Sequence, residues 1–461
     1  MLAAIGKLRL DYKVLLSSMV CRPDSRDCML HLCDDCPGKE HLLVSIQNSL
    51  RDHLDMDAED EITFSQWSHT DRPQIVTQQT MAEQFVELLV EKLDLLRIHH
   101  FIANSQARYL TECKETLDDG TAIVLMDFAE NYSFIVQDSI QGFYWDNSQA
   151  TIHPFGIYYM ENDVLCKLCV AVISDCMKHD AVSVHTFITV LMELLKTKIP
   201  ALKLVKYWSD GAASQYKNCK NLKNLCCHKE DFDVNAEWHF FATSHGKSVC
   251  DGIGGTVKQL AARASLQHAT QDHILTPMQL FTWACAHVPG ITFRYVSAES
   301  VAEHGKQLEP RLKELKTVAG TRTHHCFLPD NSGGLKLFRV SSDKMAVSAE
   351  LEHNADQRNA EDAIQPGKYA AVVYDHDWFL GYITERSEEN RDILVDFMHP
   401  KGPARSFKWP RRKDQCWAAL NHVLCVIPAP ATSSTGRQYT IDETTGERIT
   451  EAFEAFSRRN F

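Results

Sequence analysis

The sequence predicts an α/β fold in which a mixed sheet is flanked by helices. Three observations support this prediction. Apolar, β-rich runs alternate with segments of helical periodicity between residues 119 and 290. Their order is β-β-β-α-β-α-β-α, which is typical of a sheet covered by helices. The 461-residue chain is 44% hydrophobic, so it can bury a large core.

The elements follow one another in a clear order. Residues 76–118 are expected to form a helical segment, because Phe85, Leu89, Leu93 and Leu96 recur at helical spacing. The expected elements after this segment are three strands (AIVLMDF, ATIHPFGIYYM and VLCKLCVAVIS), a helix (VHTFITVLMELLKTKI), a strand (LKLVKYWSD), a helix (SQYKNCKNLKNLCCH), a strand (AEWHFFATS) and a helix (TVKQLAARASL).

The composition changes along the chain and predicts further regions around this sheet. Five short strands separated by turn residues near the C-terminus are typical of a small β-barrel. The expected regions are a Cys-rich N-terminal region at 1–75, the helical segment at 76–118, the sheet domain at 119–290, a polar acidic linker or helical region at 291–364, the β-barrel at 365–430 and a C-terminal tail at 431–461.

Three aspartates stand at the ends of apolar runs. Asp127 and Asp210 each end a β-rich run, and Asp251 lies between an apolar run and the start of an expected helix. Carboxylates placed at the ends of neighbouring strands can converge on Mg²⁺ or Mn²⁺. The alternative is local: Asp210 precedes Gly211 and would suit a turn, and Asp251 would suit a helix cap.

This arrangement resembles the catalytic region of eukaryotic cut-and-paste DNA transposases of the DDE/D kind, over residues 119–290. Their RNase H-like domain carries the first acid on the first strand, the second at the end of the fourth, and the third on a helix after the fifth. Asp127, Asp210 and Asp251 occupy those places, although the third acid is Asp rather than the commoner Glu. A cysteine/histidine segment between the second and third acids, Cys226 to His228, adds to the likeness.

The resemblance implies DNA strand cleavage and transfer by two Mg²⁺ (or Mn²⁺) ions about 3.5–4 Å apart. Asp127 would bridge both ions, and Asp210 and Asp251 would each hold one. The partner would be DNA, and the active form would be a homo-oligomer. The alternative is a catalytically inactive, transposon-derived protein that binds DNA or chromatin.

The net charge of −13 argues against a general nucleic-acid binder, so DNA contacts must come from local groups. One basic patch lies on the expected helix after Asp210, and another lies in the C-terminal region. An ordinary solvated face is the alternative for both. The candidate DNA-binding residues are Lys217, Lys220, Lys223, His245, Lys247, Arg411, Arg412 and Lys413.

A cysteine cluster near the N-terminus offers a structural zinc site. Cys21, Cys28, Cys33 and Cys36 lie within sixteen residues, and the last two form a C-x-x-C pair typical of half a zinc knuckle. The spacing of the first two is irregular, and His31 competes as a ligand. The alternative is a set of buried free thiols.

The C-terminal strands are rich in aromatic residues and resemble Tudor or SH3-like barrels. Tyr374, Trp378 and Tyr382 flank an expected strand-to-strand turn. They are candidates for an aromatic cage that holds a methylated lysine of a histone tail or another chromatin protein. The alternative is that such rings fill the small core.

The sequence shows no secretory signal peptide and no membrane-spanning segment. The sixteen cysteines are therefore expected to be reduced thiols or metal ligands. The expected location is the nucleus, after synthesis in the cytosol.

Overall fold

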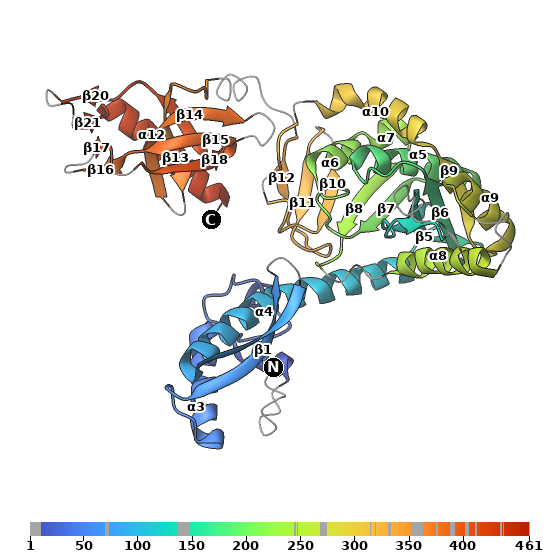
Figure 1. Cartoon of the computed structure of the whole chain (residues 1–461), viewed down its shortest axis with the longest axis horizontal. Coiled ribbons are helices and arrows are strands. Elements are labelled where there is room, and N and C mark those ends of the chain that lie inside the picture. Colours follow the sequence, from blue (N-terminus) through green and yellow to red (C-terminus); the bar gives the residue numbers. More distant parts are fainter. Residues whose placement is uncertain are drawn as a thin grey trace, which may run out of the picture. The chain divides into compact units, whose positions relative to one another are not determined.

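The computed structural model divides into two compact units (Figure 1). The first comprises Met1–Arg311 and Arg322–Ser348, and the second comprises Leu312–Thr321 and Ala349–Phe461. The residues that the structure describes are 11–69, 73–135, 148–243, 246, 248–267, 274–313, 315–318, 320–330, 333–351, 363–374, 377–387, 392–401, 405–410, 413–433, 436 and 438–460.

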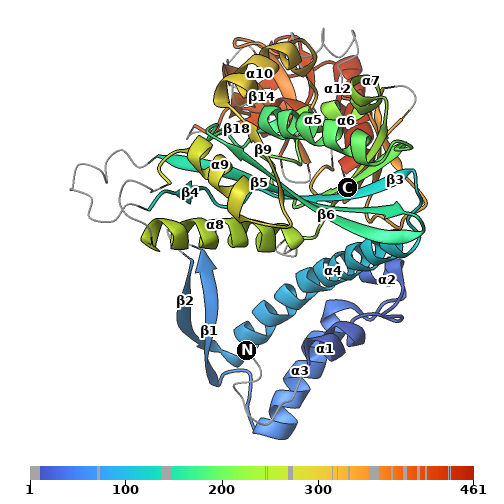
Figure 2. The ribbon, with the colours of Figure 1, turned by 90° about the vertical axis from the view of Figure 1, so that its right-hand side faces the viewer.

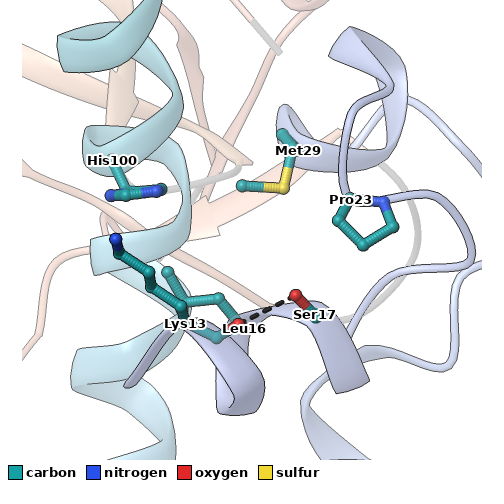
Figure 3. Close-up of a pocket in the computed structure, with 6 residues that line it drawn as sticks. All are labelled: Lys13, Leu16, Ser17, Pro23, Met29 and His100. Atoms are coloured by element: carbon teal, nitrogen blue, oxygen red, sulfur yellow. Dashed lines mark hydrogen bonds between the residues drawn. The ribbon is translucent and has the colours of Figure 1, made fainter. Parts of the chain in front are cut away.

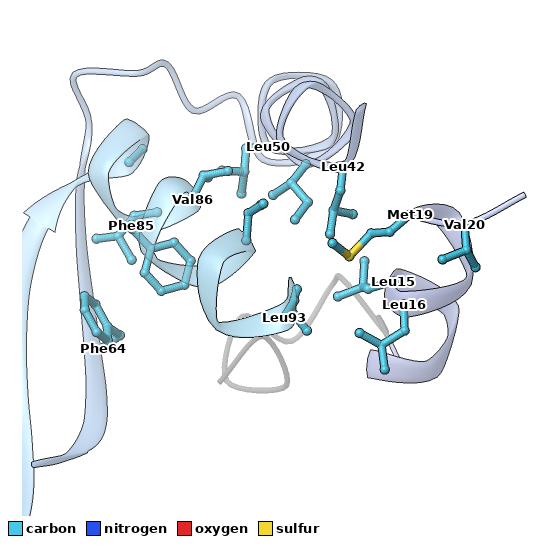
Figure 4. Close-up of a cluster of buried hydrophobic side chains, with 14 of the residues drawn as sticks. Leu15, Leu16, Met19, Val20, Leu42, Leu50, Phe64, Phe85, Val86 and Leu93 are labelled. Atoms are coloured by element: carbon cyan, nitrogen blue, oxygen red, sulfur yellow. The ribbon is translucent and has the colours of Figure 1, made fainter. Parts of the chain in front are cut away.

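The N-terminal part of the first unit packs three helices and a strand pair around a long helix. Its elements are α1 (Tyr12–Ser18), α2 (Arg26–Met29), α3 (Gly38–Leu54), β1 (Glu61–His69), β2 (Pro73–Met81) and α4 (Ala82–Glu115). Leu15, Leu42, Phe64 and Phe85 are among the buried side chains of this core (Figure 4). Residues 76–81, expected to be helical, form part of β2, which pairs antiparallel with β1.

α4 has 34 residues and therefore spans about 50 Å. Its first half packs in the N-terminal core through Val86, Val90 and Leu93. Its second half packs on the large sheet, where Cys113 contacts the core around Trp208. The helical segment expected near residues 76–118 is thus one continuous helix that belongs to both parts.

The prediction of a mixed α/β fold is confirmed. The large sheet has the order β12-β11-β10-β8-β7-β3-β5-β6-β9, and β4 pairs with β5 off this path. β5 is antiparallel to β3 and β6, whereas β3, β7 and β8 run parallel. The bounds are β3 (Thr121–Met126), β4 (Tyr132–Ser133), β5 (Gln149–Glu161), β6 (Val164–Ser174), β7 (Leu204–Ser209), β8 (Asn235–Phe240), β9 (Thr292–Val296), β10 (Cys326–Pro329), β11 (Leu335–Phe338) and β12 (Val347–Ala349).

Helices cover both faces of this sheet. Figure 2 shows α5 and α6 on one face, and α8 with the end of α4 on the other. The bounds are α5 (Ala181–Lys198), α6 (Cys219–Cys226), α7 (His228–Phe232), α8 (Val249–Gln267), α9 (Pro277–His287) and α10 (Ala298–Leu312). All six residues of the central strand β3 are buried, and the five residues after Thr121 form a continuous apolar run.

Residues 291–364, expected to be a polar acidic linker or helical region, contain helix α10 (Ala298–Leu312) and strands of the large sheet among their described residues. They supply β9, which pairs parallel with β6, and β10 and β11, which extend the sheet beyond β8. Phe293, Phe327 and Leu337 are buried in these strands. These three strands are only four or five residues long and lie among polar residues, so the hydrophobic pattern of the sequence does not predict them.

The second unit contains two antiparallel sheets, with the orders β18-β15-β14-β13-β19 and β16-β17-β21-β20. Residues 431–461, expected to be a tail, contribute two short strands and α12, whose Ile449 is buried. The bounds are β13 (Tyr369–Tyr374), β14 (Asp377–Ser387), β15 (Asp392–Phe397), β16 (His399–Pro400), β17 (Ser406–Lys408), β18 (Gln415–Ala419), β19 (Val423–Ile427), β20 (Ala431–Thr432), β21 (Tyr439–Thr440) and α12 (Glu443–Asn460).

Candidate functional site

Asp127 and Asp210 follow two neighbouring parallel strands. β3 pairs with β7 so that Leu125 lies opposite Trp208, and Asp127 and Asp210 come directly after the ends of these strands. The carboxyl ends of adjacent parallel strands share one edge of the sheet. The fold therefore brings both aspartates to the same edge of the sheet, as the order of strands and helices in the sequence predicts.

The electrostatics of Asp127 link all three aspartates. Burial raises the pKa of the Asp127 carboxyl to about 7, and the negative charges of Asp210 and Asp251 add to this rise. The backbone N–H of Phe128 opposes it by hydrogen bonding to the carboxylate. Because the charges of Asp210 and Asp251 both raise the pKa of Asp127, the three side chains belong to one electrostatic site.

Asp210 also organises the turn that follows β7. Its Oδ1 accepts a hydrogen bond of 3.0 Å from the backbone N–H of Ala212. Gly246 lies against it, because a Cβ at position 246 would be 3.3 Å from the Asp210 Cβ. The turn role and the site role of Asp210 are therefore compatible, and the segment after β8 passes close to this carboxylate.

Asp251 lies in the first turn of α8, where it acts as a cap. Its Oδ2 accepts a 2.8 Å hydrogen bond from the N–H of Ser248, and the Ser248 hydroxyl accepts one of 3.1 Å from Cys250. Asp251 therefore caps the N-terminus of α8 through Ser248, but the full capping box is not formed, because the Ser248 hydroxyl accepts from the N–H of Cys250 rather than from that of Asp251. α8 still packs near Asp127, since a Cβ on Gly254 would lie 2.9 Å from the Ala129 Cβ.

The three carboxylates do not form a tight ligand set. Within the described part of the chain, the cysteine cluster is the group whose ligand atoms all lie within 4.8 Å of one another, and the aspartates form no second such group. Asp127 and Asp210 are half-buried, whereas Asp251 is exposed. Asp127 and Asp210 therefore share one edge of the sheet, whereas the Asp251 carboxylate caps helix α8.

A buried tyrosine–histidine pair lies beneath the aspartates. Tyr216 and His153 are fully buried, and the Tyr216 hydroxyl lies 2.9 Å from His153 Nε2. Burial and the charges of Asp127 and Asp210 raise the pKa of Tyr216, which places its hydroxyl close to both. Sequence reasoning missed this pair, because a lone histidine in an apolar strand gives no separate signal.

The predicted lysine patch is only partly helical. Lys220 and Lys223 lie in α6, but Lys217 precedes the helix. The Lys217 ammonium lies 5.0 Å from the centroid of the Phe240 ring, and burial lowers its pKa to about 8. The Lys217 side chain is thus partly buried in the domain and does not extend freely into solvent.

Several other candidate DNA contacts cannot be placed. His245, Lys247, Arg411 and Arg412 lie outside the described residues. Lys413 Nζ lies 3.9 Å from an oxygen of Asp396 within the second unit.

The four N-terminal cysteines come together. The Cys21 sulfur lies 3.3 Å from that of Cys28, 3.7 Å from that of Cys33 and 3.9 Å from that of Cys36. His31 is not part of this cluster and instead contacts Arg97 and Asp94 of α4. The cluster is compatible with a structural zinc site.

Among the cysteines and histidines between residues 219 and 243 that the structure describes, no second metal-ligand group forms. The two ring nitrogens of His228 face the Tyr207 hydroxyl and the Val234 carbonyl, at 2.8 and 2.7 Å. His239 contacts Ser341 and Glu237. Both histidines are buried and held by protein partners, which leaves them no role as metal ligands.

The three aromatic residues proposed as a cage do not share one face. Tyr374 pairs with Asp377 across β13 and β14, and its ring packs near Phe397. Trp378 and Tyr382 project from the opposite face of β14, where Trp378 packs near Phe407. The period of two along a strand therefore separates Tyr374 from the other two, and the three-residue cage is not formed.

Within the described residues, no helix combines the length and apolar composition that crossing a membrane would require.

Two family models match the chain. One, described as domain of unknown function (DUF8700), matches residues 5–97, which include the cysteine cluster. The other, described as domain of unknown function (DUF8701), matches residues 106–341, which include Asp127, Asp210 and Asp251. No curated protein and no solved structure matches the chain. Because the second match spans slightly more than half of the sequence, the chain belongs to the DUF8701 family of domains of unknown function.

Proposed function

We propose that this chain carries out transposase-like DNA strand cleavage and transfer on an RNase H-like domain. The observation that carries the proposal is the pair of carboxylates, Asp127 and Asp210, at the ends of adjacent parallel strands. The raised pKa of Asp127, caused by burial and by both other carboxylates, is the second support. Such mutual repulsion is relieved when a cation binds between the groups.

The element order supports the same proposal. Counting the long strands from β3, Asp127 follows the first strand, Asp210 follows the fourth, and Asp251 lies on the helix after the fifth. These are the places in which the RNase H-like family holds its acids. The sheet agrees, since the first, fourth and fifth strands run parallel and the second runs antiparallel to the first.

The donor set of the proposed site fits hard divalent cations. Carboxylate oxygens are the ligands that Mg²⁺ and Mn²⁺ prefer. Asp127 and Asp210 would hold the metal, and Asp251 would contribute Oδ1, since its Oδ2 serves the helix cap. Bound magnesium would supply the positive charge that activates an attacking hydroxyl and stabilises the leaving oxygen of a phosphodiester.

The proposal is tested by nicking of a supercoiled plasmid in Mg²⁺ or Mn²⁺, with EDTA as the metal-free reference. Asp127→Asn and Asp210→Asn should each reduce nicking to the EDTA level. The matched control is Glu130→Gln, because the Glu130 side chain is 93% exposed, and this variant should keep full activity. If the two aspartate variants nick DNA as well as the wild type, the active-site proposal is wrong.

A second candidate function follows from the geometry of Asp251. The capping hydrogen bond of Asp251 and the absence of a tight ligand set among the described carboxylates favour a catalytically inactive, transposon-derived protein that binds DNA or chromatin. The two candidates differ in metal binding. Calorimetric titration of Mn²⁺ that depends on Asp127 and Asp210 supports the enzyme, whereas DNA binding without nicking or Mn²⁺ binding supports the inactive form.

We further propose an SH3- or Tudor-like barrel for the five-stranded sheet of the second unit. β13, β14, β15 and β18 form an antiparallel meander, and β19 returns to pair with the free edge of β13. Ala370, Val372, Ile383 and Val395 fill its small core. A partner of this unit would have to use a surface other than the three-residue aromatic cage.

A further inference from the structure

We propose that Cys21, Cys28, Cys33 and Cys36 hold one zinc ion in a closed, structural site that orders the segment between α1 and α3. The sulfur separations from Cys21 are 3.3, 3.7 and 3.9 Å, and all four sulfurs lie within 4.8 Å of one another. A tetrahedral zinc with Zn–S bonds of about 2.3 Å requires sulfur separations of about 3.8 Å. The three separations from Cys21 are therefore close to those of a zinc tetrahedron.

The chemistry of the cluster favours metal over packed thiols. Cys21 is exposed and Cys33 and Cys36 are half-buried, whereas structural thiols without a metal are usually buried among apolar groups. Four sulfur ligands also fill a tetrahedral site, so no position remains for water and the role is structural.

The segment needs such a cross-link, because it has little apolar packing of its own. Between residues 21 and 37 the buried side chains are Cys28, Met29 and Leu30. Beside it, a pocket remains between this segment, α1 and α4, with Pro23 and Met29 facing Lys13 and His100 (Figure 3). A short segment that cannot build a core is typically held by disulfides or by a metal.

The site also determines how the segment attaches to the rest of the first unit. Two residues that flank the ligands make contacts outside it. Arg26, between Cys21 and Cys28, forms a bidentate ion pair with Asp343, at 2.6 and 3.1 Å. His31, between Cys28 and Cys33, takes a left-handed backbone conformation (φ 60°) and contacts the buried Arg97 of α4. Zinc binding should therefore order both attachments together.

The test uses the full-length protein. Elemental analysis should find about one zinc ion per chain, and Cys33→Ser/Cys36→Ser should lose it. Cys285→Ser is the matched control, since Cys285 is an exposed cysteine on α9, and it should keep the zinc. Replacement of zinc by Co²⁺ should give the absorption bands of a tetrahedral tetrathiolate, which does not depend on any variant folding well.

Hydrogen exchange tests the structural role. After chelation, exchange should rise across residues 11–54 and around Arg97, should stay unchanged in β3 and β7, and should recover when zinc is added back. The proposal is overturned by a protein that contains no zinc, by iron with an iron–sulfur spectrum, or by disulfides among the four cysteines. It is also overturned if chelation leaves exchange at residues 11–54 unchanged.

Discussion

At the scale of single residues, Asp127 is the carboxyl, among those that the structure describes, whose ionisation its surroundings oppose most, and the proposed metal site depends on this repulsion. Burial and two neighbouring carboxylates oppose its ionisation, and its folded-state pKa of about 7 lies above the ordinary value of 3.8. Below pH 3.8 the carboxyl is protonated in both the folded and unfolded states and costs nothing. As the pH rises to about 7, only the unfolded state ionises freely, so the folded state becomes progressively less favourable.

Asp127→Asn should therefore stabilise the metal-free protein, and by more at pH 8 than at pH 5. Chemical unfolding in EDTA at both pH values measures the difference in the free energy of unfolding. Glu130→Gln is the control, because its exposed side chain should show little dependence on this pH range. An equal effect of Asp127→Asn at both pH values would contradict the electrostatic account of the site.

Tyr216 and His153 should be energetically coupled. Tyr216→Phe removes the hydroxyl that faces His153 Nε2 and leaves a fully buried imidazole without that partner. The expected loss is about 1–3 kcal/mol in the free energy of unfolding, measured in urea. In the double variant Tyr216→Phe/His153→Leu, the loss should be smaller than the sum of the two single losses. Strictly additive losses would show that the hydrogen bond contributes nothing.

At the scale of elements, the placement of α8 depends on one glycine. A Cβ at Gly254 would meet the Ala129 Cβ at 2.9 Å, whereas a Cβ at Gly255 would meet nothing within 4 Å. Both substitutions by alanine gain helix propensity, worth about 0.8–1 kcal/mol. Only Gly254→Ala adds a steric clash beside the segment that carries Asp127, at a cost of about 1–3 kcal/mol.

Gly255→Ala should therefore raise the unfolding midpoint, and Gly254→Ala should lower it relative to Gly255→Ala. Thermal unfolding of the two variants side by side isolates the packing term, because the propensity gain is common to both. If the two alanines stabilise the protein equally, α8 does not pack against Ala129 as described.

Sequence patterns predicted the central strands because each strand is visible as an apolar, β-rich segment within its own residues. β3 is buried at every residue, and β7 and β8 each end in three buried residues. The positions of Asp127 and Asp210 followed directly, since each is the first residue after its strand. Their proximity follows from parallel pairing, which the element order implies.

Other elements carry no local signal and depend on distant contacts. β10 has four residues and is held beside β8, where Gln106 of α4 donates hydrogen bonds to the carbonyls of Phe240 and His325. The sequence around a polar residue on a helix does not predict hydrogen-bond partners more than a hundred positions away. The strand pair β1–β2 was missed for another reason, because its sequence is largely polar and, of the side chains that the structure describes in β1, those of Ile62 and Phe64 are the buried ones.

At the scale of the whole molecule, charge constrains how this protein could bind DNA. The net charge of −13 repels a polyanion, so any affinity must come from the few basic groups near the site. Lys220 and Lys223 are candidates because α6 lies in the segment that follows Asp210. Phosphate contacts made by such lysines release counterions, and each contact contributes about −0.9 to the slope of log affinity against log salt.

Binding of a fluorescent DNA duplex should therefore weaken steeply as salt is raised. Lys220→Gln/Lys223→Gln should weaken binding at low salt and reduce the magnitude of the slope by about 1–2, measured by fluorescence anisotropy. The matched control is Lys229→Gln, which removes one positive charge from the neighbouring helix α7, where the Lys229 ammonium lies 2.6 Å from Asp233 Oδ1. If all three proteins bind with the same slope, the α6 lysines do not contact phosphate. If the wild type does not bind DNA even at low salt, DNA is not its partner, since electrostatic attraction is strongest there.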